Sequence, residues 1–177
     1  TQGLSLSTDF NKRSAVSSAT SVLTASADSD AATGSTAIVV DRLAAARIVK
    51  STSFTSASDA IGTGTLTIAV DGTSTAITVD ATNNTLSGLK SAINSSGAAV
   101  TASIVNDGTS ASPVYRLVVQ SKETGTANAV AISGTLTGGT DPFPGGGTEV
   151  QAAADALFSV NGLTITRRSN PVSDVVT

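Results

Sequence analysis

The 177-residue sequence lacks cysteine, histidine, methionine and tryptophan, and the first two absences remove most catalytic chemistry. Without cysteine there are no disulfides, no cysteine nucleophile and few ways to build a structural zinc site. Without histidine there is no ordinary catalytic triad and no histidine-based metal centre. General acid–base catalysis would fall to carboxylates, lysines or Tyr115. The composition therefore argues against an enzyme.

The carboxylates are scattered along the chain and mostly stand in turn-like sequence, where aspartate is favoured because it bonds to the local backbone. Examples are Asp59, Asp71, Asp107 and Asp141. A glycosidase pair could still form from carboxylates distant in sequence. Asp28 and Asp30 are spaced as in a calcium loop, but no full ladder of ligands follows them. We predict no catalytic, cofactor-binding or metal-binding residues.

Charge is also scarce. Charged residues make up 13% of the chain and hydrophobic residues 40%, which indicates one folded domain or two small ones and not a disordered polyampholyte. The formal charge is −3 and no basic cluster exceeds the pair Arg167 and Arg168, so nucleic acid is a poor candidate partner. No apolar run reaches the roughly 18 residues of a membrane helix, and no leader pattern is visible. Since residue 1 is not methionine, we interpret the chain as a fragment cut at both ends.

A hairpin is predicted over residues 65–79. Apolar side chains alternate with small polar ones on both sides of Asp71 and Gly72, which suit a turn with positive φ. The period then changes: Leu86, Leu89 and Ile93 recur at helical spacing. Asn84 or Thr85 can cap this short helix, and Gly97 follows its end.

Strand-like alternation returns at residues 100–104 and again at 115–119. The whole run therefore reads as strand, strand, helix, strand, strand. We expect the two hairpins to form one sheet covered by the helix, because the apolar stripe and the apolar sheet face can bury each other.

The run "TLTIAVDGTSTAITVDATNNTLSGLKSAINSSGAAVTASIVNDG", continued by "YRLVVQSKETGTANAVAIS", resembles the ββαββ insertion motif of bacterial flagellar axial proteins. Two flanking segments are similar to the flagellar filament cap family, also called hook-associated protein 2. They are "GSTAIVVDRLAAARIVKSTSF" before the motif and "ADALFSVNGLTITRRSNPVSDVV" after it. The three segments appear in the family's order and together span about residues 35–176.

The resemblance implies a mainly β (α+β) fold of two small β-sandwich-like units, one of them containing the ββαββ motif, with the terminal stalk helices absent. An inserted domain at 51–149 would hang from a discontinuous outer domain formed by 1–50 and 150–177. Sequential units split near residue 60 are the alternative. The resemblance also favours edge strands around 12–25 over a poorly ordered tail, and a long strand at 35–49, bent near Leu43, over a helix at 41–49.

Further expectations concern the remaining segments. Residues 51–64 read as a linker, and 133–149, rich in glycine and proline, as a loop after a strand at 130–132. Phe143 in that loop is interpreted as a tucked plug, with an exposed tip contact as the alternative. Residues 157–166 predict a hairpin around Asn161 and Gly162. A short helix is expected after Ser169 or Asn170, with Pro171 at its first position.

For function, the resemblance implies the outer domains of a filament cap that sits at the filament tip and promotes flagellin polymerisation. The location would be outside the cell, after export through the flagellar secretion channel. Partners would be flagellin subunits and further copies in a ring, with this fragment monomeric and no cofactor, nucleic acid or membrane bound. Alternatives are a hook–filament junction protein, a flagellin outer domain, or an adhesin-like module for host mucin or glycans.

Overall fold

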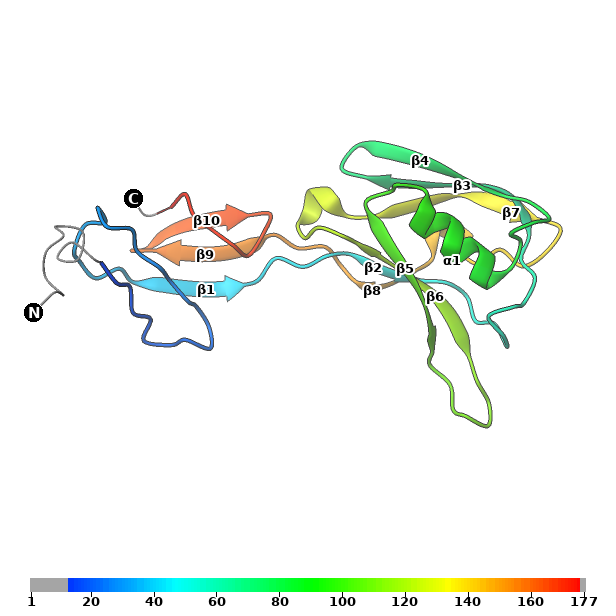
Figure 1. The fold of residues 1–177 in the computed structure, drawn as a ribbon, viewed down its shortest axis with the longest axis horizontal. Coiled ribbons are helices and arrows are strands. Elements are labelled where there is room, and N and C mark those ends of the chain that lie inside the picture. Colours follow the sequence, from blue (N-terminus) through cyan, green and yellow to red (C-terminus); the bar gives the residue numbers. More distant parts are fainter. Residues whose placement is uncertain (1–12, 176–177) are drawn as a thin grey trace, which may run out of the picture.

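The computed structural model describes residues 13–175, whose ten strands form three antiparallel sheets (Figure 1). The strands are β1 (Ile38–Arg42), β2 (Ile48–Lys50), β3 (Thr63–Val70), β4 (Thr73–Val79), β5 (Val100–Asn106), β6 (Tyr115–Ser121), β7 (Ala131–Thr137), β8 (Thr148–Gln151), β9 (Ala156–Val160) and β10 (Leu163–Arg167). The α-helix of the described residues is α1 (Leu86–Ser95), and two 3₁₀ turns are η2 (Thr126–Asn128) and η3 (Pro144–Gly146). The expected mainly β class with one short helix is confirmed.

Two of the sheets pack together as a sandwich, which we call the central body (residues 48–151). Their strand orders are β4–β3–β7 and β5–β6–β2–β8, and apolar side chains from both sheets belong to one buried cluster. Leu66 of β3 and Leu117 of β6 are 1% and 0% exposed. The alternation read from the sequence therefore places every second side chain in a shared core.

The expectation of a single two-hairpin sheet is wrong. Hairpin β3–β4 lies in one sheet and hairpin β5–β6 in the other, where β6 pairs with β2. The helix explains the separation: α1 joins the edge strand β4 to the edge strand β5 and inserts Leu86, Leu89 and Ile93 into the core. Its apolar stripe thus closes one side of the sandwich instead of covering a single sheet.

The two ends of α1 agree with the sequence. The hydroxyl of Thr85 accepts a hydrogen bond from the Gly88 N–H at 3.0 Å, which makes Thr85 and not Asn84 the N-cap. Gly97 follows the helix with φ +79°, in the left-handed region where glycine is favoured.

The opposite side of the sandwich is closed by the segment between β7 and β8. Phe143 is 1% exposed there, so the plug interpretation is confirmed. The expected loop at 133–149 was too long, because its start belongs to β7 and its end to β8. The expected linker at 51–64 is also not a free linker, since Phe54 and Ile61 are buried in the core.

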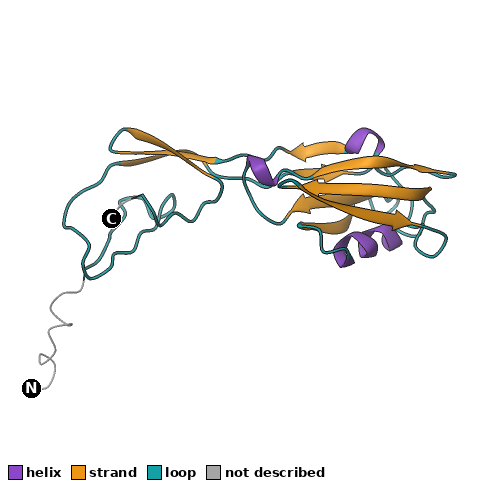
Figure 2. Ribbon diagram, turned by 90° about the horizontal axis from the view of Figure 1, so that it is seen from above, coloured by secondary structure: helices purple, strands orange, loops and turns teal. Residues whose placement is uncertain are grey.

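The third sheet, β1–β9–β10, forms what we call the outer sheet. Figure 2 shows it at one end of an elongated molecule and the central body at the other. The predicted hairpin at 157–166 is confirmed, with Asn161 and Gly162 at φ +49° and +85° in the turn between β9 and β10. Strand β1 pairs with β9, so Ile38, Val160 and Leu163 lie side by side across the sheet.

Two segments next to the outer sheet differ from expectation. The described part of the expected edge strands, residues 13–25, forms no strand, and residue 12 lies outside the described residues. Its Ser, Thr and Ala side chains offer little apolar area to bury against a sheet. The short helix expected after Ser169 is absent through residue 175, because the Asn170 side chain instead bonds the Ala44 backbone, accepting from its N–H at 2.7 Å and donating to its C=O at 3.1 Å.

Between the outer sheet and the central body, the long strand expected at 35–49 is interrupted. It consists of β1 and β2 with an isolated bridge between Ala45 and Ala154, so the helix alternative at 41–49 is wrong. The expected domain boundaries near residues 50 and 150 fall within the paired strands β2 and β8. No helix in residues 13–175 is long and apolar enough to cross a bilayer.

Candidate interaction surface

The carboxylates singled out in the sequence stay apart and serve local structure. Asp59 accepts hydrogen bonds from the Thr55 and Ser56 backbone N–H groups at 2.7 and 2.9 Å. Asp141 accepts the Phe143 N–H. Within residues 13–175, no three His, Cys, Asp or Glu side chains come together as metal ligands would.

The other candidates are equally structural. Asp107 pairs with Arg116 at 2.7 Å, and the turn residue Asp71 lies 3.9 Å from Arg168. Tyr115, the remaining candidate for proton transfer, is partly buried against the core, and its backbone is paired with Phe54. Among these residues, no acid and base side chains lie together as general acid–base catalysis would require.

Four aspartates nevertheless have lowered pKa values, because hydrogen-bond donors stabilise their charged form. The largest causes are the Ser56 N–H at Asp59, the Thr82 hydroxyl at Asp80, the Thr126 N–H at Asp155 and the Arg167 side chain at Asp174.

The lowered pKa values predict a loss of stability in acid. A carboxyl group whose folded-state pKa lies below its unfolded value of about 4 stabilises the fold above that pH, and the stabilisation disappears as the pH falls through the folded-state pKa. We expect the thermal midpoint to be flat near neutrality and to drop below about pH 4. Thermal unfolding followed by circular dichroism across this range measures it. The variant Asp59→Asn should drop less steeply, and an equal drop would contradict the assignment of Asp59.

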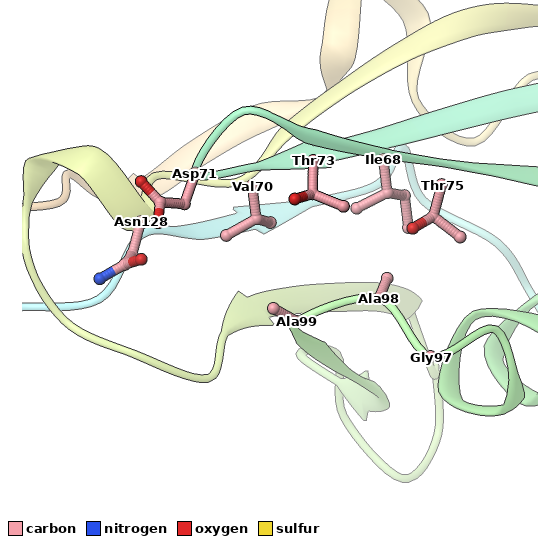
Figure 3. Close-up of a pocket in the computed structure, with 9 residues that line it drawn as sticks. All are labelled: Ile68, Val70, Asp71, Thr73, Thr75, Gly97, Ala98, Ala99 and Asn128. Atoms are coloured by element: carbon pink, nitrogen blue, oxygen red, sulfur yellow. The ribbon is translucent and has the colours of Figure 1, made fainter.

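One open pocket of about 260 Å³ lies between hairpin β3–β4 and residues 97–99 (Figure 3). It exists because Thr73 and Thr75 take core-facing positions at the end of β4, where the opposing side chains of Ala98 and Ala99 are small. Asp71 is its single ionisable side chain. The pocket lacks converging charged or polar groups that would bind one chemical class of ligand.

The outward face of the sheet β4–β3–β7 is uniform in composition. Strand alternation places Thr, Ser and Ala at every outward position of these three strands, and none of the strands contains a charged residue. We call this surface the Ser/Thr/Ala face, and its members are Thr63, Thr65, Thr67, Ala69, Ser74, Ala76, Thr78, Ala131, Ser133, Thr135 and Thr137.

All members of the face are exposed except Thr67 and Ala69, which are half-buried on the central strand. The register aligns Thr65 with Thr78 on one side and Thr135 on the other, so small β-branched side chains run across the sheet. Such a face carries only small, uncharged side chains, and a protein partner could bury it without removing any charge from water. The sequence signal was the threonine at alternate positions, but which strands lie side by side could not be read from it.

The hairpin–helix–hairpin segment of the central body matches a known family model. Residues 65–123 match the model described as the flagellin hook IN motif. Residues 1–47 match the model described as the flagellar hook-associated protein 2 N-terminus. The two matches place the chain in the class of flagellar hook-associated proteins. Relatives that match nearly the whole chain define the family.

Flagellar hook-associated protein 2 of Escherichia coli K12 is 35% identical over 94% of this chain, and the B-type protein of Pseudomonas aeruginosa PAO1 is 35% identical over 94%. The solved D2–D3 domains of the E. coli flagellar cap protein FliD share 32% identity at a TM-score of 0.69, covering 82% of this chain and 80% of that one. The P. aeruginosa FliD structure has the same identity and TM-score and is covered to 71%.

This chain belongs to the flagellar hook-associated protein 2 family. It spans 38% and 39% of the lengths of the two curated relatives.

Proposed function

We propose that this chain forms the outer domains of a flagellar filament cap, which sits at the filament tip and promotes the polymerisation of exported flagellin. The observation that carries the proposal is the likeness to the cap protein domains of E. coli, at 32% identity over 80% of that solved chain. The role is structural and not enzymatic. Its place is outside the cell, reached through the flagellar secretion channel.

In this proposal the partners are flagellin subunits and further copies of the protein, arranged as a ring. The Ser/Thr/Ala face supplies one contact with a neighbouring subunit. This contact is supported by the small side chains of the face, its lack of charge and its exposure over three strands. A charge introduced at the middle of such a contact would be buried without a partner, which costs about 3–5 kcal/mol.

The test is filament growth by the intact protein in a bacterium whose own cap gene has been deleted. We expect the parent protein to restore filaments, and the variant Thr65→Arg, on the Ser/Thr/Ala face, to weaken the contact more than about a hundredfold and lose them. The matched control is Thr101→Arg, which changes an exposed residue of β5 on the other sheet and should restore filaments. Filament length in electron micrographs and flagellin released into the medium are the readouts.

Two outcomes separate the parts of this proposal. Failure of the parent protein to restore filaments, with the protein exported and folded, would overturn the cap function. Filaments of normal length with Thr65→Arg would overturn only the role of the face. Equal melting temperatures of the purified variants establish that any loss arises from contact and not from unfolding.

Three finer points belong to the same proposal. The chain divides into an inserted domain near 51–149 and an outer domain near 1–50 with 150–177, supported by the separate sheets. The 177-residue fragment alone is monomeric, which light scattering after size-exclusion chromatography tests. Binding of host mucin or glycans stays a prediction. A glycan array on which the protein binds no glycan would contradict it.

A further inference from the structure

The outer sheet and the central body are joined by two chain segments, and within residues 13–175 they share no hydrophobic core. The segments are 43–47 and 152–155, here called the neck, and they run side by side (Figure 1). The apolar cluster of the central body draws its members from residues 49–143 and includes none from β1, β9 or β10. Packing of apolar side chains therefore does not fix the angle between the two parts.

The two ends of the neck are tied to different parts of the molecule. On the outer side, the side chain of Asn170 bonds both the N–H and the C=O of Ala44. On the side of the central body, the Gln151 side chain donates to the Ala46 C=O at 2.9 Å. Ala45 lies between these two ties and is the natural pivot of the neck.

A loop of the central body forms hydrogen bonds to this pivot and to the residues around it. Its residues 124–126, here called the clamp, make four hydrogen bonds to the neck and the outer sheet. The Gly125 N–H donates to the Ala45 C=O at 3.2 Å. Thr126 donates to both carboxylate oxygens of Asp155, its N–H at 2.8 Å and its hydroxyl at 2.9 Å. The Thr124 hydroxyl donates to the C=O of Arg168, directly after β10, at 2.8 Å.

The clamp fits closely enough to require glycine at its centre. Gly125 has φ +97°, and a Cβ at this position would lie 2.8 Å from the Arg168 carbonyl oxygen and 3.0 Å from Asp155. The side chain of Asn128 donates to the Thr124 C=O at 2.6 Å and so holds the loop in shape. Three consecutive residues thereby contact the pivot, the start of β9 and the end of β10.

We propose that residues 124–126 are an orientation clamp that locks the outer sheet at one angle to the central body, and that Ala45 is the hinge about which the two parts move when the clamp opens. The four bonds are polar, and none of the residues that make them belongs to the apolar cluster. Release of the clamp therefore changes the angle while both parts stay folded. The clamp does not depend on the proposed function, because it concerns the geometry of this chain alone.

The test is a distance measurement on the 177-residue chain, which has no native cysteine to interfere with labelling. Spin labels at Thr164→Cys on β10 and Ser103→Cys on β5 report the angle, since both positions are exposed and lie in different parts. In the labelled parent we expect a single narrow distance distribution by electron–electron double resonance. With Asp155→Ala we expect a broad distribution that includes distances absent from the parent.

Matched controls exist within the central body. Asp80 accepts from the N–H and the hydroxyl of Thr82 as Asp155 does from Thr126. Asp80→Ala should therefore leave the distribution narrow. Thr126→Val and its control Thr82→Val are milder variants, because each removes only one hydroxyl donor. We expect Thr126→Val to broaden the distance distribution and Thr82→Val to leave it narrow.

The distances and the melting curves together decide the outcome. A broad distribution in Asp155→Ala or Thr126→Val, with melting of the central body unchanged and the control variants narrow, supports the clamp. A narrow, unshifted distribution in both clamp variants overturns it. Broadening in the Asp80→Ala and Thr82→Val controls to the same extent also overturns it, because the effect would then not be specific to residues 124–126.

Discussion

Replacing Gly134 by valine is expected to unfold the central body. Gly134 lies in β7 opposite Leu66 of the central strand β3, and its φ is +101°. A Cβ built there would lie 2.3 Å from the Thr65 carbonyl oxygen, which belongs to the backbone and cannot rotate away. Backbone strain and this clash together should cost more than about 4 kcal/mol, a large part of the 5–15 kcal/mol typical of a whole domain.

The matched control for this substitution is Gly138→Val. Gly138 also has positive φ, at +75°, but nothing lies within 4 Å of the position its Cβ would take. We expect it to cost only the strain of about 1–3 kcal/mol. Urea unfolding of both variants measures the difference. Equal free energies of unfolding for the two variants would show that the close approach of Gly134 to the Thr65 carbonyl oxygen does not exclude a larger side chain.

Truncation of Phe143 to alanine is the second large effect we expect. Its side chain is 1% exposed and closes the side of the sandwich between β7 and β8. Removing a buried phenylalanine costs about 3–5 kcal/mol, because the ring's transfer energy is lost and a cavity remains. The neighbouring backbone keeps the site from collapsing: Asp141 holds the Phe143 N–H, and Gly147 lies directly against the ring.

Leu163→Ala is the comparison for Phe143, since Leu163 is 72% exposed at the turn of the outer sheet. An exposed leucine contributes little, and we expect a change within about 0.5 kcal/mol. The readout is again the free energy of unfolding in urea. A loss below about 1 kcal/mol for Phe143→Ala would mean that the segment between β7 and β8 rearranges to fill the space.

Local structure could be predicted from the sequence wherever one short pattern decides it. Alternation around Asp71 and Gly72 gave the first hairpin, and the pair Asn161 and Gly162 gave the last. The spacing of Leu86, Leu89 and Ile93 gave the helix. In each case the paired residues are close in sequence, at most 15 positions apart at Gly64 and Val79, so one short pattern contains both partners.

Pairing between distant strands could not be predicted in this way. Val49 pairs with Val119 through β2 and β6, and a period of two says which side of a strand is buried but not which strand lies beside it. Strand β8 is exposed at all four positions, so it shows no alternation to detect. Asn170 read as a helix cap, whereas its amide completes the backbone pairing of Ala44, 126 residues away.

The candidate surface was visible in part. Threonine at alternate positions of residues 63–67 was plain in the sequence, but the Ser/Thr/Ala face exists only because β4 and β7 flank β3. The clamp was not visible. Asp155 and Thr126 are 29 residues apart, and neither stands in a pattern that distinguishes it from the many other Thr and Asp residues of the chain.

Because the Ser/Thr/Ala face carries no charge, contacts made through it should depend little on the salt concentration of the surrounding water. At physiological salt, attraction between exposed charges is screened beyond about 8–10 Å. The strands β3, β4 and β7 contain no ionisable group, so this screening does not affect contacts between them and a partner. Contacts through this face should hold alike in fresh water and in brine. In the proposed filament cap, a subunit contact through this face would therefore keep its strength when the salt concentration of the medium changes.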